Sequence, residues 1–231
     1  VASENPLIME KIQVDNEVAR LRILKAAHEG KRFALQDAVT FQYPKRIQSL
    51  EKELQSLQMD LDRRNQAMEV QPGFAITLQG KVYEKHKEAG EVLRGIIEGV
   101  TAFTRHEVGM YKGFQVFVQK DMMEPVLFLQ GEKEYSVELK SSDSGNMVRM
   151  ENRLNALDKA VEDVQKEIKT CENEIKNAKQ EYAKPFPYEE LLKENITRQM
   201  EIDAELEIKD QEECVEVQEE TKNLPCQTAV R

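Results

Sequence analysis

The chain has 231 residues, 40% of them hydrophobic and 33% charged, and it contains no tryptophan. It has no run of about 18 uncharged apolar residues, which excludes a transmembrane helix, and its first thirty residues lack the apolar core of a signal peptide. We therefore expect a cytoplasmic protein without a membrane partner.

The net charge of −10 is concentrated in residues 201–220, which hold ten acidic side chains and one basic one. Because the chain begins at Val1 rather than at methionine, we interpret it as a piece of a longer protein.

Residues 1–43 are predicted to form N-terminal helices. Proline is favoured at the first position of a helix, so Pro6 indicates a helix start, and apolar residues then recur at helical spacing. Gly30 either ends this helix or weakens it, and Pro44 is expected to interrupt the chain. The stretch 6–41 is long enough to pack on the arms predicted below or on a part of the protein outside this chain.

Two segments place apolar residues at alternating steps of three and four, which is typical of a coiled coil. One seam runs from Ile47 to about Met68 and the other from Met150 to Tyr182. They predict arm 1 over residues 44–70 and arm 2 over residues 147–183, paired as an antiparallel hairpin.

Residues 71–146, between the arms, alternate in a way that predicts strands. We expect one strand over 74–83 with a bend at Gly80, then a helix over 84–100, and then four further strands. Those four strands are predicted at residues 107–111, 114–120, 126–130 and 135–139. The sequence therefore predicts a βαββββ head with an antiparallel sheet covered by one helix.

After arm 2, prolines at 185 and 187 interrupt the chain, and residues 184–208 are predicted as a C-terminal helix. Residues 209–231 are predicted as an acidic, disordered tail. The predicted fold class is α+β: a long antiparallel coiled-coil hairpin with an inserted small antiparallel β-sheet plus one helix, and further helices at both ends.

Catalytic signatures do not occur in the sequence. The three histidines and three cysteines show no spacing of metal ligands, and no phosphate-binding loop or nucleophile elbow is found. The carboxylates of the arms lie at helical spacing from lysines, which supports helices rather than acid–base chemistry. We therefore expect no enzymatic activity, no metal and no cofactor in this chain.

One group of basic and aromatic residues in the head is a candidate nucleic-acid site, because cations contact phosphates and aromatic rings stack on bases. Its members are Lys81, Tyr83, Lys85, Lys87, Arg94 and Lys112, with His86, Arg105 and Phe114 among or beside them in the sequence. The competing interpretation is that the aromatic rings belong to the core and the lysines keep an exposed helix end soluble. Arg63 and Arg64 fall between seam positions of arm 1 and are predicted on a solvated face.

Several strings resemble the C-terminal region of one family. They are NPLIMEK (5–11), DNEV (15–18), FAITLQGKVYEKHKEAG (74–90), YKGF (111–114), GNMVRMENRL (145–154) and AKPFPYEELL (183–192). The family comprises large bacterial helicase–DNA methylase proteins of mobile elements, which resemble superfamily 2 (Swi/Snf-like, DEAD/DEAH-box) helicases. Motor and methylase motifs are absent from the chain. The resemblance implies a non-catalytic accessory domain that contacts DNA or a partner and adjoins the motor domains of the same polypeptide. The alternative is a coiled-coil assembly module that binds no nucleic acid.

Overall fold

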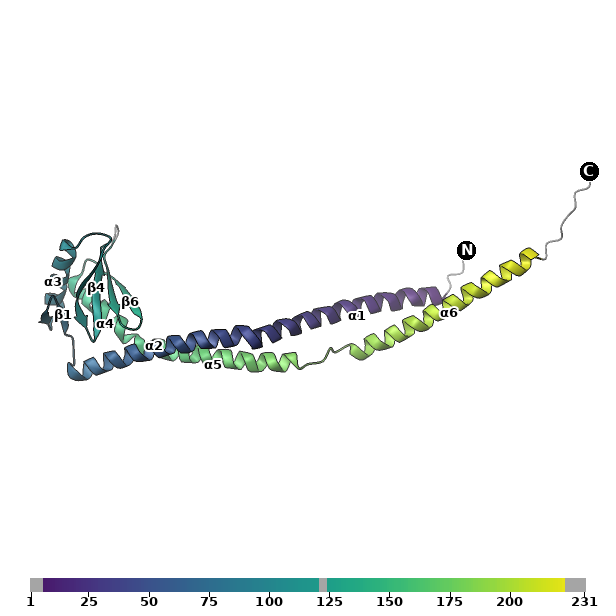
Figure 1. Ribbon diagram of the computed structural model, residues 1–231, viewed down its shortest axis with the longest axis horizontal. Coiled ribbons are helices and arrows are strands. Elements are labelled where there is room, and N and C mark those ends of the chain that lie inside the picture. The colour runs from purple at the N-terminus through teal and green to yellow at the C-terminus, as the bar shows by residue number, and fades with distance from the viewer. Residues whose placement is uncertain (1–5, 121–123, 223–231) are drawn as a thin grey trace, which may run out of the picture. The chain divides into compact units, whose positions relative to one another are not determined.

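A computed structural model describes residues 6–120 and 124–222, with side chains as far as residue 209 (Figure 1). The chain divides into two units, one formed by residues 41–175 and the other by residues 1–40 with 176–231. The α+β fold class is confirmed. None of the described helices combines the length and the apolar character needed to cross a bilayer.

The head, in the unit 41–175, is built on a six-stranded antiparallel sheet with the strand order β2-β1-β3-β4-β5-β6. Its strands are β1 (Ile76–Leu78), β2 (Lys81–Tyr83), β3 (Arg105–Tyr111), β4 (Phe114–Gln119), β5 (Val126–Gln130) and β6 (Glu134–Glu138). The last four strands confirm the predicted ones to within two residues at each end.

The single strand predicted over 74–83 is wrong, because it is a hairpin of β1 and β2. Gln79 and Gly80 lie between the strands with φ of 48° and 80°, and two left-handed residues in succession reverse a chain tightly. The expected bend at Gly80 is this turn, so the head has the order ββαββββ.

Two helices pack on one face of the sheet: α3 (His86–Gly99) and α4 (Asp143–Asn155) (Figure 1). Leu93 of α3 and Met147, Met150 and Leu154 of α4 are all buried in one core with the strands. The predicted start of arm 2 therefore belongs to the head. The rest of predicted arm 2 forms a separate helix, α5 (Leu157–Tyr182), which begins after a break at Ala156.

The helical hairpin consists of α2 (Tyr43–Val70) and α5. Two ion pairs show that the helices run in opposite directions. Arg46, near the start of α2, pairs with Glu167 at 2.6 Å, and Arg64, near the end of α2, pairs with Asp158 in the first turn of α5 at 2.7 Å. Leu57 of α2 packs in the same core as the first turns of α5. The antiparallel hairpin is confirmed.

Pro44 does not interrupt the chain as predicted. Helix α1 (Pro6–Asp37) continues through a π-helical turn (Ala38–Gln42) directly into α2. Proline lacks a backbone N–H and clashes with the carbonyl four residues earlier, which costs most inside a regular α-helix. Here Pro44 lies in the first turn of α2, just after the wider π-helical turn, where these penalties are small.

In the other unit, α1 pairs antiparallel with α6 (Glu189–Lys222). Val18 and Leu21 pack on Leu192, and Arg198 holds Glu10 with two hydrogen bonds of 2.7 and 3.0 Å. The partner of the N-terminal helix within this chain is thus α6, which the sequence did not reveal.

Helix α6 also corrects the predicted disordered tail, because its backbone remains helical from residue 209 to Lys222. The predicted tail residues 223–231 lie outside the described residues.

Candidate binding surfaces of the head

Four of the predicted nucleic-acid residues lie together in the chain, on β2 and around the start of α3. The Lys81 ammonium sits 5.2 Å from the centre of the Tyr83 ring. Lys85 forms an ion pair of 2.8 Å with Glu88, and this hydrogen bond raises the pKa of Lys85 and lowers that of Glu88. Lys87 is exposed on the first turn of α3. Part of the positive charge of this group is thus already neutralised.

The remaining two predicted residues are held elsewhere on the head. Arg94, further along α3, pairs with Asp143 at 3.0 Å. Lys112 lies in the turn between β3 and β4, and its ammonium donates a 2.6 Å hydrogen bond to the carbonyl oxygen of Gly73. Lys112 therefore meets a neutral oxygen where Lys85 and Arg94 meet carboxylates.

Lys112 lines a pocket of about 440 Å³, here called the α2–β3 pocket. The pocket is lined by Arg63, Gln66, Ala67, Val70 and Gln71 of the α2 end, Ala75 and Thr77 of the β1 segment, and Met110, Lys112 and Gly113 of β3 and its turn. Among the described residues, the lining contains two cations and no carboxylate. Val70 and Met110 add apolar surface, with 87% and 49% of each residue exposed. The lining suits a ligand that combines an anionic group with an apolar body.

The backbone fixes the position of both cations. Lys112 has a φ of 50° and Gly113 a φ of 81°, which makes the tight β3–β4 turn. A Cβ on Gly113 would lie 2.8 Å from Cγ of Arg63, so the missing side chain lets Arg63 approach this turn. Partial burial lowers the pKa of Lys112, an effect that the charge of Glu151 opposes. Arg63 itself pairs with Glu132 at 3.0 Å and with Asp60 at 3.4 Å.

A buried aspartate anchors the α2 side of the pocket. Asp60 is fully buried and accepts hydrogen bonds from the backbone N–H groups of Glu132 and Lys133 at 2.7 and 2.9 Å, and from the Tyr135 hydroxyl at 2.7 Å. A Cβ on Gly131 would lie 2.1 Å from Oδ1 of Asp60. This carboxylate therefore fixes helix α2 against the β5–β6 turn.

Arg64 is not on a solvated face as predicted, because it is 7% exposed. Its guanidinium donates to the carbonyl oxygen of Leu154 at 3.0 Å and to both carboxylate oxygens of Asp158 at 2.7 and 3.2 Å. The hydrogen bond to Arg64 lowers the pKa of Asp158. Arg64 thus satisfies a carbonyl at the end of α4 and ties the α4–α5 break to α2.

Sequence reasoning singled out Arg105 but did not reveal its aromatic partners on the sheet face opposite the core. The Arg105 guanidinium lies 4.8 Å from the ring centre of Phe117 and 4.3 Å from that of Phe128, and it pairs with Glu134 at 2.6 Å. The alternation in β4 contains a signal, because Phe117 falls out of phase with the buried residues Val116 and Val118.

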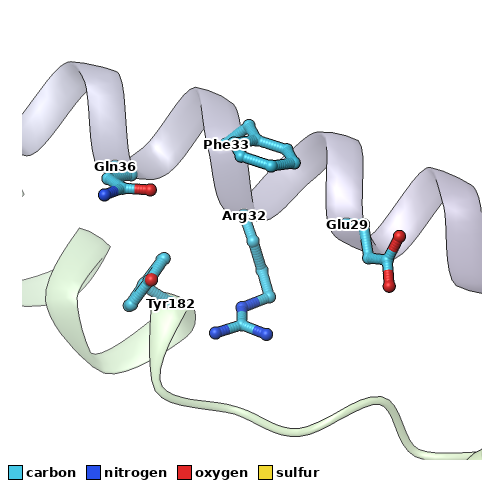
Figure 2. Close-up of a pocket in the computed structure, with 5 residues that line it drawn as sticks. All are labelled: Glu29, Arg32, Phe33, Gln36 and Tyr182. Atoms are coloured by element: carbon cyan, nitrogen blue, oxygen red, sulfur yellow. The ribbon is translucent and has the colours of Figure 1, made fainter.

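Outside the head, a second pocket of about 350 Å³ lies between α1 and the end of α5. It is lined by Glu29, Arg32, Phe33, Gln36 and Tyr182. Figure 2 shows Arg32 extending from α1 towards Tyr182, and its guanidinium carbon lies 4.7 Å from the ring centre. Arg32 therefore occupies much of the approach to Tyr182, which leaves the α2–β3 pocket as the better candidate site.

No group of three or more His, Cys, Asp or Glu side chains in the described part of the chain is placed to hold a metal ion. Comparison of the chain with protein-family models, with curated proteins and with solved structures finds no match. The resemblance to helicase–methylase proteins therefore stays a prediction.

Proposed function

We propose that this chain is a non-catalytic accessory module of a helicase-like DNA-processing protein, and that its head contacts DNA at the α2–β3 pocket. The observation that carries the proposal is Lys112, which contacts a neutral carbonyl oxygen in a pocket whose lining holds no carboxylate, beside an Arg63 that is paired with Glu132 and Asp60. Phosphate contacts supply most of the affinity of proteins for DNA without sequence preference, and they require cations that are free to approach the backbone.

The predicted residues differ in how well they meet this requirement. A phosphate that approaches Lys85 or Arg94 has to displace Glu88 or Asp143, whereas at Lys112 it displaces only a backbone carbonyl. The apolar side chains of Val70 and Met110 and the amides of Gln66 and Gln71 offer contacts for a sugar or an unpaired base next to the phosphate. This composition favours single-stranded DNA over the duplex.

Fluorescence anisotropy with labelled single-stranded and duplex DNA tests the proposal. We expect binding at about 50 mM salt that weakens steeply by about 200 mM. Lys112→Gln should reduce affinity several-fold, while the matched variant Lys87→Gln should bind like the wild type. If affinity survives loss of Lys112 but falls on removal of Lys81, Lys85 and Lys87, the contact lies at the originally predicted group and the pocket assignment is wrong.

The alternative function is an assembly module that binds no nucleic acid. It is favoured by large apolar side chains exposed on α1, among them Ile23 at 70% and Phe33 at 72%. Absence of DNA binding even at low salt would favour this alternative. ATP hydrolysis by the purified chain would contradict both functions, because each assigns it no catalysis.

A further inference from the structure

Helix α1 carries two apolar stripes, and α6 covers only one of them. The covered stripe contains Val14, Val18 and Leu21, which pack on α6. The second stripe runs through Ile12, Asn16, Ala19, Ile23, Ala26, Gly30 and Phe33. Every member of this stripe, here called the outer stripe, is exposed, and the fractions reach 51% for Ile12, 70% for Ile23 and 72% for Phe33.

The outer stripe has the spacing of a coiled-coil seam. Its successive members are four, three, four, three, four and three residues apart, which keeps them on one line along an α-helix. One polar residue, Asn16, interrupts the apolar members, and in the register argued below it lies opposite Phe33 of the second copy. The pattern is that of a helix that pairs on both sides.

The sizes of the side chains favour an antiparallel copy of the same stripe. In the register in which Ile23 faces Ala26 of a second copy, Ala19 faces Gly30, so the largest member near the centre meets a small one. A parallel pairing would instead place Gly30 on Gly30 and Ala26 on Ala26, which leaves two neighbouring layers of the seam poorly filled.

The charges beside the stripe select the same register. Arg22 and Glu29 flank the outer stripe on one side and are exposed. Neither Arg22 nor Glu29 forms an ion pair with another residue in the described part of the chain. Arg20, on the other flank, is paired with Glu17 at 2.6 Å. In the antiparallel register, Arg22 faces Glu29 of the second copy, and this happens twice about the two-fold axis. Shifting the register by one heptad in either direction places Arg22 on Arg22 or Glu29 on Glu29.

We infer that the outer stripe of α1 binds the outer stripe of a second copy of this chain in an antiparallel, two-fold symmetric coiled coil. An interface of this kind is self-complementary and closes after two copies, so the product is a dimer and not a filament. The inference concerns a surface separate from the α2–β3 pocket and holds whether or not the head binds DNA.

Sedimentation equilibrium of the full chain over a range of concentrations tests the dimer. The wild type should dimerise, and Ile23→Glu should weaken dimerisation by about 100-fold or more because it places a charge in the seam. The side chain of Ile23 makes no part of the α1–α6 core, so circular dichroism should show unchanged helix content. A wild type that stays monomeric at every concentration overturns the inference and leaves the stripe to a different partner.

A charge swap tests the orientation. Arg22→Glu should weaken the dimer by about tenfold, because two attractive contacts become repulsive. Adding Glu29→Arg should restore it, since each new glutamate then meets a new arginine across the axis. Within one helix the two positions are seven residues apart and do not touch, so restoration reports the contact between copies. A double variant that dimerises no better than Arg22→Glu alone contradicts the antiparallel register.

Discussion

Removal of the Asp60 carboxylate is expected to destabilise the head more than any other single truncation of a polar side chain on α2. Asp60 is fully buried and satisfies two backbone N–H groups of the β5–β6 turn and the Tyr135 hydroxyl. Hydrogen bonds to a charged group contribute roughly 1.5–3 kcal/mol each, but the turn at Glu132 is exposed enough for water to replace part of them. We therefore expect Asp60→Ala to lower the free energy of unfolding of the head by about 3–5 kcal/mol.

The neighbouring residue provides the control, because Asp62 is exposed on the same helix. Asp62→Ala should change stability by less than about 0.5 kcal/mol. Tyr135→Phe, which removes one of the four donors to Asp60, should cost about 1–2 kcal/mol. Hydrogen exchange of the β4–β6 amides, measured by mass spectrometry, reports the head separately from the other unit. Equal protection in Asp60→Ala and Asp62→Ala would refute the anchoring role.

Three further predictions concern the packing and titration of the head. In α3, Gly90→Ala should destabilise the head by about 1–3 kcal/mol, because the new Cβ would lie 2.4 Å from the carbonyl oxygen of Asp143. Gly95→Ala, on the same helix with open space around it, should stabilise the head by up to about 1 kcal/mol, and urea unfolding measures both changes. Arg64→Ala should cost about 1–3 kcal/mol and increase hydrogen exchange at the α4–α5 break, and an unchanged exchange rate there would contradict its bridging role. Burial raises the pKa values of Tyr111 and Tyr135 above their usual 10.0, so the stability they provide is complete below pH 10 and is lost above it, as the unfolded chain ionises first. Urea unfolding at pH 8 and about pH 11 should show this loss, and replacing both tyrosines by phenylalanine should reduce it.

Periodicity predicted the elements of the head and hairpin well but did not predict their partners. Met150 and Leu154 continue the heptads of arm 2, yet they pack on the sheet as part of α4. A helix that covers a sheet and a helix in a coiled coil bury stripes of the same spacing, so the sequence alone does not separate them. The break at Ala156 also leaves no proline or glycine in the sequence.

The candidate site was only partly predictable. Lys112 was found because it follows a strand among aromatic residues, but its neighbour Arg63 lies about fifty residues earlier and joins it only through the fold. Arg64 was predicted on a solvated face because its partners, Leu154 and Asp158, are far away in the sequence. Charges are judged exposed unless a partner is visible nearby, and partners that come from long-range packing are not visible in a sequence.

The most direct test of the proposed function is a photo-crosslink to single-stranded DNA from two alternative positions. A photoreactive amino acid at position 66, in the lining of the α2–β3 pocket, should crosslink to bound DNA, and the same amino acid at position 87, on the first turn of α3, should crosslink much less. Crosslinking from position 87 but not from 66 would contradict the assignment of the pocket, and none from either position under conditions of measured binding would remove the head as the DNA contact.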